Sequence, residues 1–168
     1  MYLDLHEIIE MPGGSVPFRC ELDRERLEFP ALEEFTGPVT AEGAVKNTAG
    51  LLELAGAVHA DMAVRCDRCA RVFPRSIDLP VSAALKADPD EDDYADLFPL
   101  DGDGVDVSDV LETCFILAMD QKFLCREDCA GLCPVCGKDL NEGPCGCGKQ
   151  IDPRMAVLSQ LLDDIQEV

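Results

Sequence analysis

Apolar and polar side chains alternate along the middle of the chain in the manner of half-buried β-strands. Every even position from residue 52 to residue 64 is apolar or glycine, whereas the odd positions include Glu53, His59 and Asp61. The alternation returns between residues 77 and 85. A period of two residues places one face of a strand on the core and the other in solvent. The pattern therefore predicts two long strands, with the stretch between them near the tip of a hairpin.

Weaker patterns extend this sheet toward the N-terminus. Residues 47–50, Asn-Thr-Ala-Gly, are typical of a turn, and residues 39–45 before them have the composition of a partner strand. Apolar positions within residues 3–5 and 18–22 predict further strands. Residues 1–87 are therefore expected to form a β-rich domain built on an antiparallel sheet, either open or closed into a barrel-like form.

Residues 88–107 have a different composition. Asp and Glu dominate this stretch, which contains no Lys or Arg, as is typical of a solvated loop. Residues 101–104, Asp-Gly-Asp-Gly, resemble the start of a calcium-binding EF-hand loop. Val105 stands where that loop needs an acid or amide, and Asp106 stands where it needs Gly. We therefore predict an acidic loop without a calcium site.

The C-terminal part combines helices with a cysteine-rich segment. Ser108 is the predicted N-cap of a helix whose apolar stripe comprises Val110, Leu111, Cys114, Phe115, Leu117 and Ala118. Asp152 caps a second helix and Pro153 occupies its first turn, with an apolar face of Met155, Leu158, Leu161, Leu162 and Ile165. Residues 108–168 are expected to form one structural unit with the β part, so the predicted fold class is α+β.

The overall composition is strongly acidic, because the 168 residues carry a net charge of −20. Phosphate backbones repel such a surface, so any RNA contact needs a local basic patch, and a basic protein is the easier partner. The sequence has neither a signal-peptide pattern nor an apolar run of about 18 residues. We therefore expect a cytoplasmic protein that does not engage membranes.

Ten cysteines in a reducing compartment favour metal binding over disulfides. Eight of them are closely paired as Cys66 and Cys69, Cys125 and Cys129, Cys133 and Cys136, and Cys145 and Cys147. Short spacings let two thiolates reach one tetrahedral ion, with Zn–S distances of about 2.3 Å. Four such pairs predict two structural Zn²⁺ sites, although a site of four cysteines also accepts iron.

The spacing leaves the grouping of the pairs open. We favour one local site of Cys133, Cys136, Cys145 and Cys147, so that Cys66 and Cys69 join Cys125 and Cys129 across a long gap in sequence. An interleaved grouping and a single zinc site with spare thiols remain alternatives. Four thiolates fill a tetrahedron and leave no position for water or substrate, so the predicted zinc is structural and no enzyme is expected.

The remaining candidate residues have simpler explanations. Cys20 and Cys114 fall on apolar faces and are predicted to be small core residues, and His59 lies on the polar face of a strand. Four arginines surround the first cysteine pair, with only Asp67 as an acid among them: Arg65, Arg68, Arg71 and Arg75. These arginines either neutralise the thiolates and solvate a strand edge, or bind a partner through a phosphate or an acidic group.

Three segments of the chain resemble a known family. Residues 64–73 hold the first cysteine pair with its arginines, residues 124–141 hold two further pairs, and residues 151–154 read Ile-Asp-Pro-Arg. Together they resemble the bacterial and plastid YceD family, the large ribosomal RNA subunit accumulation proteins. The resemblance implies a role in the accumulation or processing of large-subunit rRNA, in a family not known as enzymes.

The sequence therefore predicts a non-catalytic factor in large ribosomal subunit biogenesis that supports 23S rRNA accumulation or processing. Its expected partner is a basic ribosomal protein or 23S rRNA, and no small-molecule substrate is expected. Two alternatives come from other classes. One is a redox-responsive zinc protein or chaperone, in which oxidation expels the metal. The other is an enzyme acting on RNA, for which the sequence shows no catalytic cluster.

Overall fold

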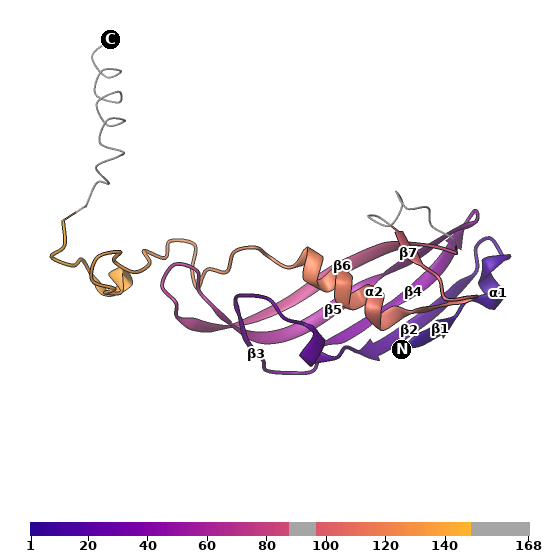
Figure 1. The fold of residues 1–168 in the computed structure, drawn as a ribbon, viewed down its shortest axis with the longest axis horizontal. Helices are drawn as coiled ribbons and strands as arrows, with labels where there is room; N and C mark the ends of the chain where they lie inside the picture. Colours follow the sequence, from indigo (N-terminus) through magenta and orange to yellow (C-terminus); the bar gives the residue numbers. More distant parts are fainter. Residues whose placement is uncertain (88–96, 149–168) are drawn as a thin grey trace, which may run out of the picture.

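The computed structural model describes residues 1–87 and 97–148. Long strands form most of the molecule, and the cysteine-rich segment extends it at one end (Figure 1). The elements in chain order are β1 (Tyr2–Asp4), α1 (His6–Ile9), β2 (Ser15–Glu21), the 3₁₀ turn η1 (Arg24–Arg26), β3 (Leu32–Phe35), β4 (Thr40–Thr48), β5 (Leu51–Arg65), β6 (Val72–Lys86), β7 (Leu97–Pro99), β8 (Gly104–Asp106), α2 (Val107–Ala118) and the 3₁₀ turn η3 (Leu140–Glu142).

The main sheet is open. Its strands follow the order β2-β4-β5-β6-β7, and β3 pairs with the part of β5 that β4 leaves free. All neighbours are antiparallel except β6 and β7, which are parallel, and β1 pairs with β8 in a separate two-stranded sheet. Because β2 and β7 remain as edges, the barrel-like alternative is wrong. Helix α2 packs on β6 and covers the apolar face, so that face is buried without closure (Figure 1).

The predicted long hairpin is confirmed as β5 and β6. Their register runs without interruption from the pair Leu52↔Leu85 to the pair Arg65↔Val72. The apolar even positions of β5 are buried, whereas His59 on the other face remains about half exposed. A strand with one buried face cannot slip by one residue without moving its apolar side chains into solvent. The alternation therefore fixes this register, and with it the position of the hairpin tip.

Helix α2 differs from its prediction at both ends. The N-cap is Asp106 rather than Ser108, because β8 ends at Asp106 and its carboxylate accepts a 2.9 Å hydrogen bond from the Ser108 N–H. The Ser108 hydroxyl instead lies 2.8 Å from the N-terminal amine. The predicted stripe is buried only as far as Phe115. Leu117 is 79% exposed and Ala118 is also exposed, so the last turn leaves the core.

The range predicted as an acidic loop contains two short strands in its described part. Leu97 and Phe98 in β7 pair with the end of β6, and Val105 in β8 is buried beside Leu3 in β1. These few apolar residues form the strands, and the acidic residues around them make the strand pattern hard to recognise in the sequence. The predicted C-terminal helix, 152–165, lies outside the described residues. Among the described residues, no helix is long and apolar enough to span a membrane.

Candidate metal centres at the hairpin tip

The tip of the β5–β6 hairpin holds the first cysteine pair. Cys66 N–H donates to the Arg71 carbonyl and Ala70 N–H donates to the Cys66 carbonyl, each at 2.9 Å. These two bonds close a tight turn, in which Ala70 takes a left-handed backbone angle (φ 57°). The turn holds Cys66 and Cys69 together, and both are buried although they lie at the end of an elongated molecule.

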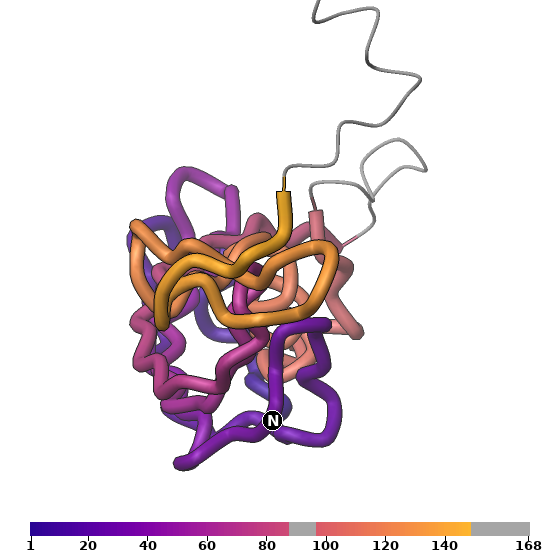
Figure 2. Tube along the Cα trace, turned by 90° about the vertical axis from the view of Figure 1, so that its left-hand side faces the viewer, coloured from indigo at the N-terminus to yellow at the C-terminus, as the bar shows by residue number. Residues whose placement is uncertain are grey.

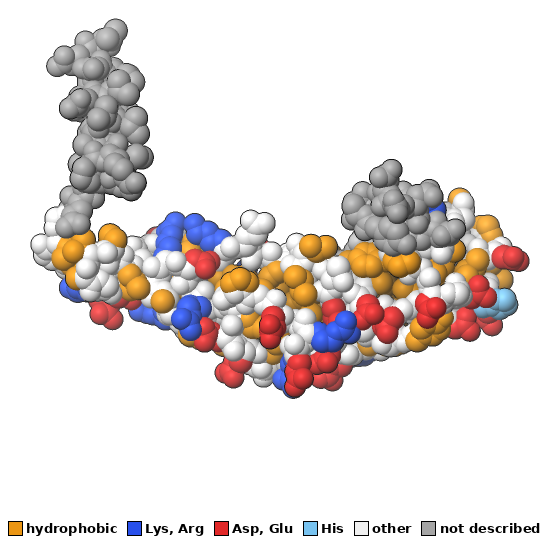
Figure 3. Space-filling view, in the orientation of Figure 1, with side chains coloured by type: hydrophobic (Ala, Val, Ile, Leu, Met, Phe, Trp, Pro, Cys, Tyr) orange, Lys and Arg blue, Asp and Glu red, His pale blue; other side chains and the backbone are white. Residues whose placement is uncertain are grey.

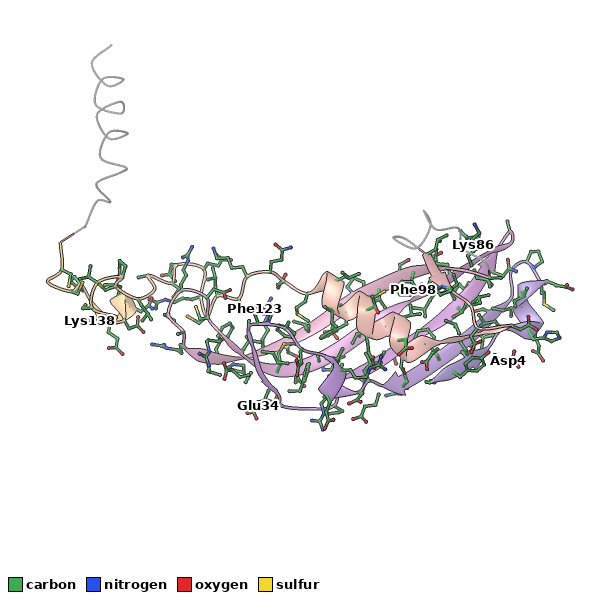
Figure 4. The ribbon with its side chains drawn as sticks, viewed as in Figure 1. Asp4, Glu34, Lys86, Phe98, Phe123 and Lys138 are labelled. Carbon is green, nitrogen blue, oxygen red and sulfur yellow. The ribbon has the colours of Figure 1, made fainter. Side chains whose placement is uncertain are left out.

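Asp67 joins this tip to the segment that follows α2. Its N–H donates to the Phe123 carbonyl at 2.9 Å, and its carboxylate accepts a hydrogen bond from the Phe123 N–H at 2.6 Å. Phe123 is buried and stacks on Phe29, with ring centroids 5.6 Å apart. Figure 4 labels Phe123 at this junction. These two hydrogen bonds, called the Asp67 clamp below, therefore hold the chain beside the hairpin tip just before Cys125.

Cys66, Cys69, Cys125 and Cys129 form the cluster nearer to the sheet, called the proximal cluster below. The sulfur of Cys66 lies 3.8 Å from that of Cys129, and the sulfurs of Cys69 and Cys125 are 3.6 Å apart. Four sulfurs at the usual zinc–thiolate bond length form a tetrahedron with edges of about 3.8 Å. The donor set and the sulfur spacing of the proximal cluster therefore fit a four-coordinate Zn²⁺ ion.

The distal cluster comprises Cys133, Cys136, Cys145 and Cys147, whose sulfurs lie within 4.8 Å of one another. Its first pair forms a knuckle, because Cys133 N–H donates to the Lys138 carbonyl and Gly137 N–H donates to the Cys133 carbonyl, both at 2.8 Å. Figure 4 labels Lys138 within this outermost part of the described chain. The distal cluster is more open than the proximal one, since Cys136 is exposed.

These two clusters match the favoured grouping of the cysteine pairs, and they do not match the interleaved grouping. Both can hold metal ions and are compatible with structural zinc. Cys20 and Cys114 lie outside the clusters, half-buried against the hydrophobic core as predicted. Burial raises the pKa of both thiols.

The thiols within each cluster differ in how readily they ionise. Burial raises the pKa of Cys66, but hydrogen bonds from the backbone N–H groups of three neighbours outweigh it and lower that pKa to about 6. Backbone N–H groups likewise lower the pKa of Cys133 to about 6. Burial and the neighbouring thiols raise the pKa of Cys125 to about 12. A hydrogen bond with Cys136 and, to a smaller extent, burial raise the pKa of Cys147 to about 12. A cation among the sulfurs would stabilise the ionised form of all four thiols in a cluster.

Further backbone contacts fasten the cysteine-rich segment to the hairpin. Arg68 donates from Nη1 to the Cys129 carbonyl at 2.8 Å and to the Glu127 carbonyl at 3.3 Å, and the Arg68 carbonyl accepts from the Leu132 N–H at 3.0 Å. Gly131 makes this approach possible. It has a left-handed backbone angle (φ +75°), and a Cβ added there would lie 2.9 Å from the Arg68 carbonyl oxygen.

The four predicted partner-binding arginines all have contacts within the chain. Arg68 holds backbone carbonyls, as described above. The other three form ion pairs: Arg65 with Glu33 at 2.6 Å, Arg71 with Asp139 at 3.3 Å, and Arg75 with Asp120 at 3.6 Å. Each of these three side chains is still about half exposed. Arg68 therefore has a structural role although it is also exposed, and the guanidinium groups of the other three are paired with carboxylates.

Charge is distributed unevenly between the two ends of the molecule. The hairpin tip and the cysteine-rich segment, residues 65–75 and 120–148, contain seven Lys and Arg and six Asp and Glu. The rest of the described chain contains five Lys and Arg and eighteen Asp and Glu. Figure 3 shows blue side chains gathered toward the cysteine-rich end of the visible face, and red ones along the sheet. By its Lys, Arg, Asp and Glu, the cysteine-rich end is therefore close to neutral, whereas the rest of the described chain is strongly acidic. Two Zn²⁺ ions held by eight thiolates would add a charge of −4 at this end, so its arginines are an exception within an acidic surface.

Sequence reasoning missed the polar residues that support the clusters. Asp139 accepts hydrogen bonds from the Asn141 N–H (2.8 Å) and side-chain amide (2.6 Å), and the Asn141 amide also donates to the Cys129 sulfur at 3.4 Å. An Asp two residues before Asn is a local turn signal that the sequence does offer. The contact with a cysteine twelve residues away has no such signal.

Together, the fold and the clusters define a class: an open β-sheet with one group of four cysteines at the tip of its longest hairpin and a second group in the segment beyond that tip. Residues 54–162 match the family described as large ribosomal RNA subunit accumulation protein YceD. The match covers about two thirds of the sequence, and the chain belongs to this family.

The curated relatives are matched only locally. Three curated proteins, one from Mycobacterium bovis and two from strains of Mycobacterium tuberculosis, are described as uncharacterized. Each is 51% identical to this chain over 39 residues, which is 23% of this chain and 19% of the relative. The alignment thus spans about a fifth of the length of these relatives. No solved structure matches the chain.

Proposed function

We propose that the protein is a non-catalytic, cytoplasmic factor in large ribosomal subunit biogenesis, supporting the accumulation or processing of 23S rRNA. The observation that carries the proposal is membership of the YceD family, in a chain whose half-exposed Arg65, Arg71 and Arg75 lie at the end that holds two cysteine clusters. The protein would act by presenting a rigid surface to a large-subunit component. Its metal would maintain the shape of that surface without reacting with a substrate.

The composition of the clusters supports a structural role for the metal. Each cluster supplies four thiol sulfurs, which fill the coordination sphere of a tetrahedral ion. Catalytic zinc sites instead keep one position for water or substrate. The chemistry that zinc would supply here is the cross-linking of four chain positions. This chain's own contribution is the turn, the Asp67 clamp and the N–H donors that place the sulfurs.

The charge distribution supports two kinds of contact with ribosomal components. Arg65, Arg71 and Arg75 are half exposed at the metal-fixed end, where guanidinium groups can hydrogen-bond with the phosphates of a short rRNA element. The strongly acidic sheet would repel the rest of the RNA and would suit a basic ribosomal protein. The half-exposed arginines make direct rRNA contact the first interaction to test.

The experiment is affinity purification of the tagged full-length chain from cells at low and moderate salt, with and without RNase. We expect co-purification of large-subunit rRNA or proteins. The double variant R71E/R75E should lose this material and keep its zinc. The control R19E/R24E makes the same charge change at two exposed arginines on the sheet half, and it should retain the partners.

The outcomes separate the possible partners. Loss of the co-purified proteins after RNase treatment would identify rRNA as the direct partner, and their persistence would identify a basic ribosomal protein. Wild-type chain that recovers no large-subunit component at either salt concentration would contradict the proposal. Redox enzymes or unfolded chains as the main prey would then favour the redox-responsive alternative.

A further inference from the structure

Asn141 lies in one cluster's segment but contacts the other cluster. In sequence it falls between the two cysteine pairs of the distal cluster, within the 3₁₀ turn η3. Its side-chain Nδ2 nevertheless donates a 3.4 Å hydrogen bond to the sulfur of Cys129, a member of the proximal cluster. A thiolate that accepts an N–H donor is held in one orientation and its negative charge is partly balanced. Asn141 is therefore placed to support a cluster to which it contributes no ligand.

The orientation of this amide is determined by its other partners. Asn141 Oδ1 accepts from the Ala130 N–H at 2.8 Å and from Arg126 Nη2 at 2.7 Å. Because both donors need an oxygen, the NH₂ group must be the end that faces the sulfur. Asp139 Oδ1 accepts from the same NH₂ group at 2.6 Å and from the Asn141 backbone N–H at 2.8 Å. Four hydrogen bonds thus fix the donor that reaches Cys129.

The segment that carries Asn141 is held by the distal cluster. The knuckle bonds around Cys133 and the hydrogen bond from Lys138 Nζ to the Pro144 carbonyl (3.0 Å) close the loop between the two distal pairs. Leu140 N–H donates to the Gly131 carbonyl at 2.9 Å. Because Gly131 lies against Arg68 of the hairpin tip, this hydrogen bond links the loop to the hairpin. Metal at the distal cluster would keep this loop in place, and its loss would free Asn141 to move.

We propose that Asn141 is a positioning residue for the proximal metal site and couples the two clusters, so that an occupied distal site strengthens metal binding at the proximal site. The inference rests on structural metal at both clusters, which is part of the proposed function, and it is independent of the ribosomal partner. Since coupling free energies between two binding sites are reciprocal, an empty proximal site must weaken metal binding at the distal site by the same factor.

The test measures the zinc affinity of each site in the full-length chain by competition with a chelator. Replacing partners that orient metal ligands typically weakens metal binding about 10- to 100-fold. We expect N141A to weaken the proximal site by such a factor. N141D keeps the oxygen that accepts from Ala130 and Arg126 but removes the donor to sulfur, so it should weaken the site similarly. The control E142Q changes the exposed neighbour of Asn141 and should leave both affinities unchanged.

Coupling is tested in a second background. The variant C136S/C147S removes two distal ligands, and we expect its proximal site to bind zinc about 10- to 100-fold more weakly than in the wild-type chain. Adding N141A to that background should have little further effect, since both changes break the same link. Cobalt absorption at the proximal cluster reports whether four thiolates still coordinate, and circular dichroism reports whether the sheet is folded.

Three results would overturn the inference. One is a proximal affinity in N141D equal to that of the wild type. Another is a proximal affinity that does not change when the distal ligands are removed. The third is additivity of N141A with C136S/C147S, which would show that the two changes act separately. None of these results depends on whether ribosomal components bind, so this inference and the ribosomal proposal can fail independently.

Discussion

The sheet and the cysteine-rich segment achieve order by different physical means. The sheet buries a continuous apolar core that includes fully buried Leu54, Met62 and Phe115. The segment 120–148 buries little apolar surface beyond Phe123, and its Leu132 and Val135 are 40% and 48% exposed. Figure 2, viewed from this end, shows the segment as a single irregular tube with few turns of regular structure. Hydrophobic burial can order the sheet, whereas the segment requires a cross-link.

Metal binding and hydrophobic burial therefore stabilise different parts of the molecule. A change to the metal should act at the hairpin tip and beyond it, and a change to the core should act on the sheet. The clamp between Asp67 and Phe123 lies at the boundary, because Phe123 packs in the core while its backbone holds the hairpin tip.

Removal of zinc should have the largest effect. Structural zinc in small cysteine sites contributes roughly 10–16 kcal/mol of apparent binding free energy, which is folding free energy for a segment without its own core. A chelator should therefore abolish hydrogen-exchange protection in residues 124–148 and leave protection in β4, β5 and β6. Loss of protection in the sheet at the same chelator concentration would contradict the division.

A cavity in the core should destabilise the sheet and leave zinc binding in the cysteine-rich segment unchanged. Phe115 is fully buried and lies 6.4 Å from Phe35, between ring centroids, so F115A should destabilise the sheet by about 3–5 kcal/mol. L117A changes a side chain on the same helix that is 79% exposed, and its effect should remain within about 0.5 kcal/mol. Urea denaturation measures both values. Zinc content should be unchanged in each variant under native conditions.

Gly131 tests the boundary between the two regions. G131A would introduce strain at a left-handed φ and also place its Cβ 2.9 Å from the Arg68 carbonyl oxygen, whereas G137A introduces only the strain, because no atom lies within 4 Å. Left-handed strain costs roughly 1–3 kcal/mol, so G137A gives the baseline and G131A should exceed it. Chelator-induced zinc release from the proximal cluster is the measurement. Equal release rates in the two variants would show that the close approach to Arg68 is unimportant.

The smallest effect concerns His59 on the solvent face of the sheet. A 2.7 Å hydrogen bond with Asp78 raises the pKa of His59 above its ordinary value. Because the folded-state pKa is the higher one, the stabilisation is fully present below the unfolded-state pKa and is lost as pH rises through the folded-state pKa. NMR titration should give a lower His59 pKa in D78N, and the same pKa as wild type in E142Q. An unchanged pKa in D78N would contradict the contact.

Much of this arrangement follows from local patterns in the sequence. Alternation along β5 and β6 predicted the hairpin because one buried face leaves a single register. The hairpin then placed Cys66 and Cys69 at a tip. Spacing left the grouping of the four cysteine pairs open, and the structure shows the grouping that the sequence analysis favoured. These features depend on residues a few positions apart or on a strict period, which is why the sequence reveals them.

Other features depend on distant contacts that no local pattern encodes. The parallel pairing of β7 with β6 and the β1–β8 pair arise where isolated apolar residues meet strands far away in sequence. Asp106 replaces Ser108 as the helix cap because β8 ends there. The roles of Arg68 and Asn141 are likewise set by which carbonyl or sulfur the fold brings to them.

The most direct test of the account is the metal content of the purified full-length chain, measured by native mass spectrometry together with elemental analysis. We expect two zinc ions per chain at saturating zinc. We also expect the loss of one ion in C66S/C69S, the loss of the other in C136S/C147S, and the loss of both when all four residues are replaced. Fewer than two ions in the wild-type chain, or the loss of the same ion in both double variants, would contradict it.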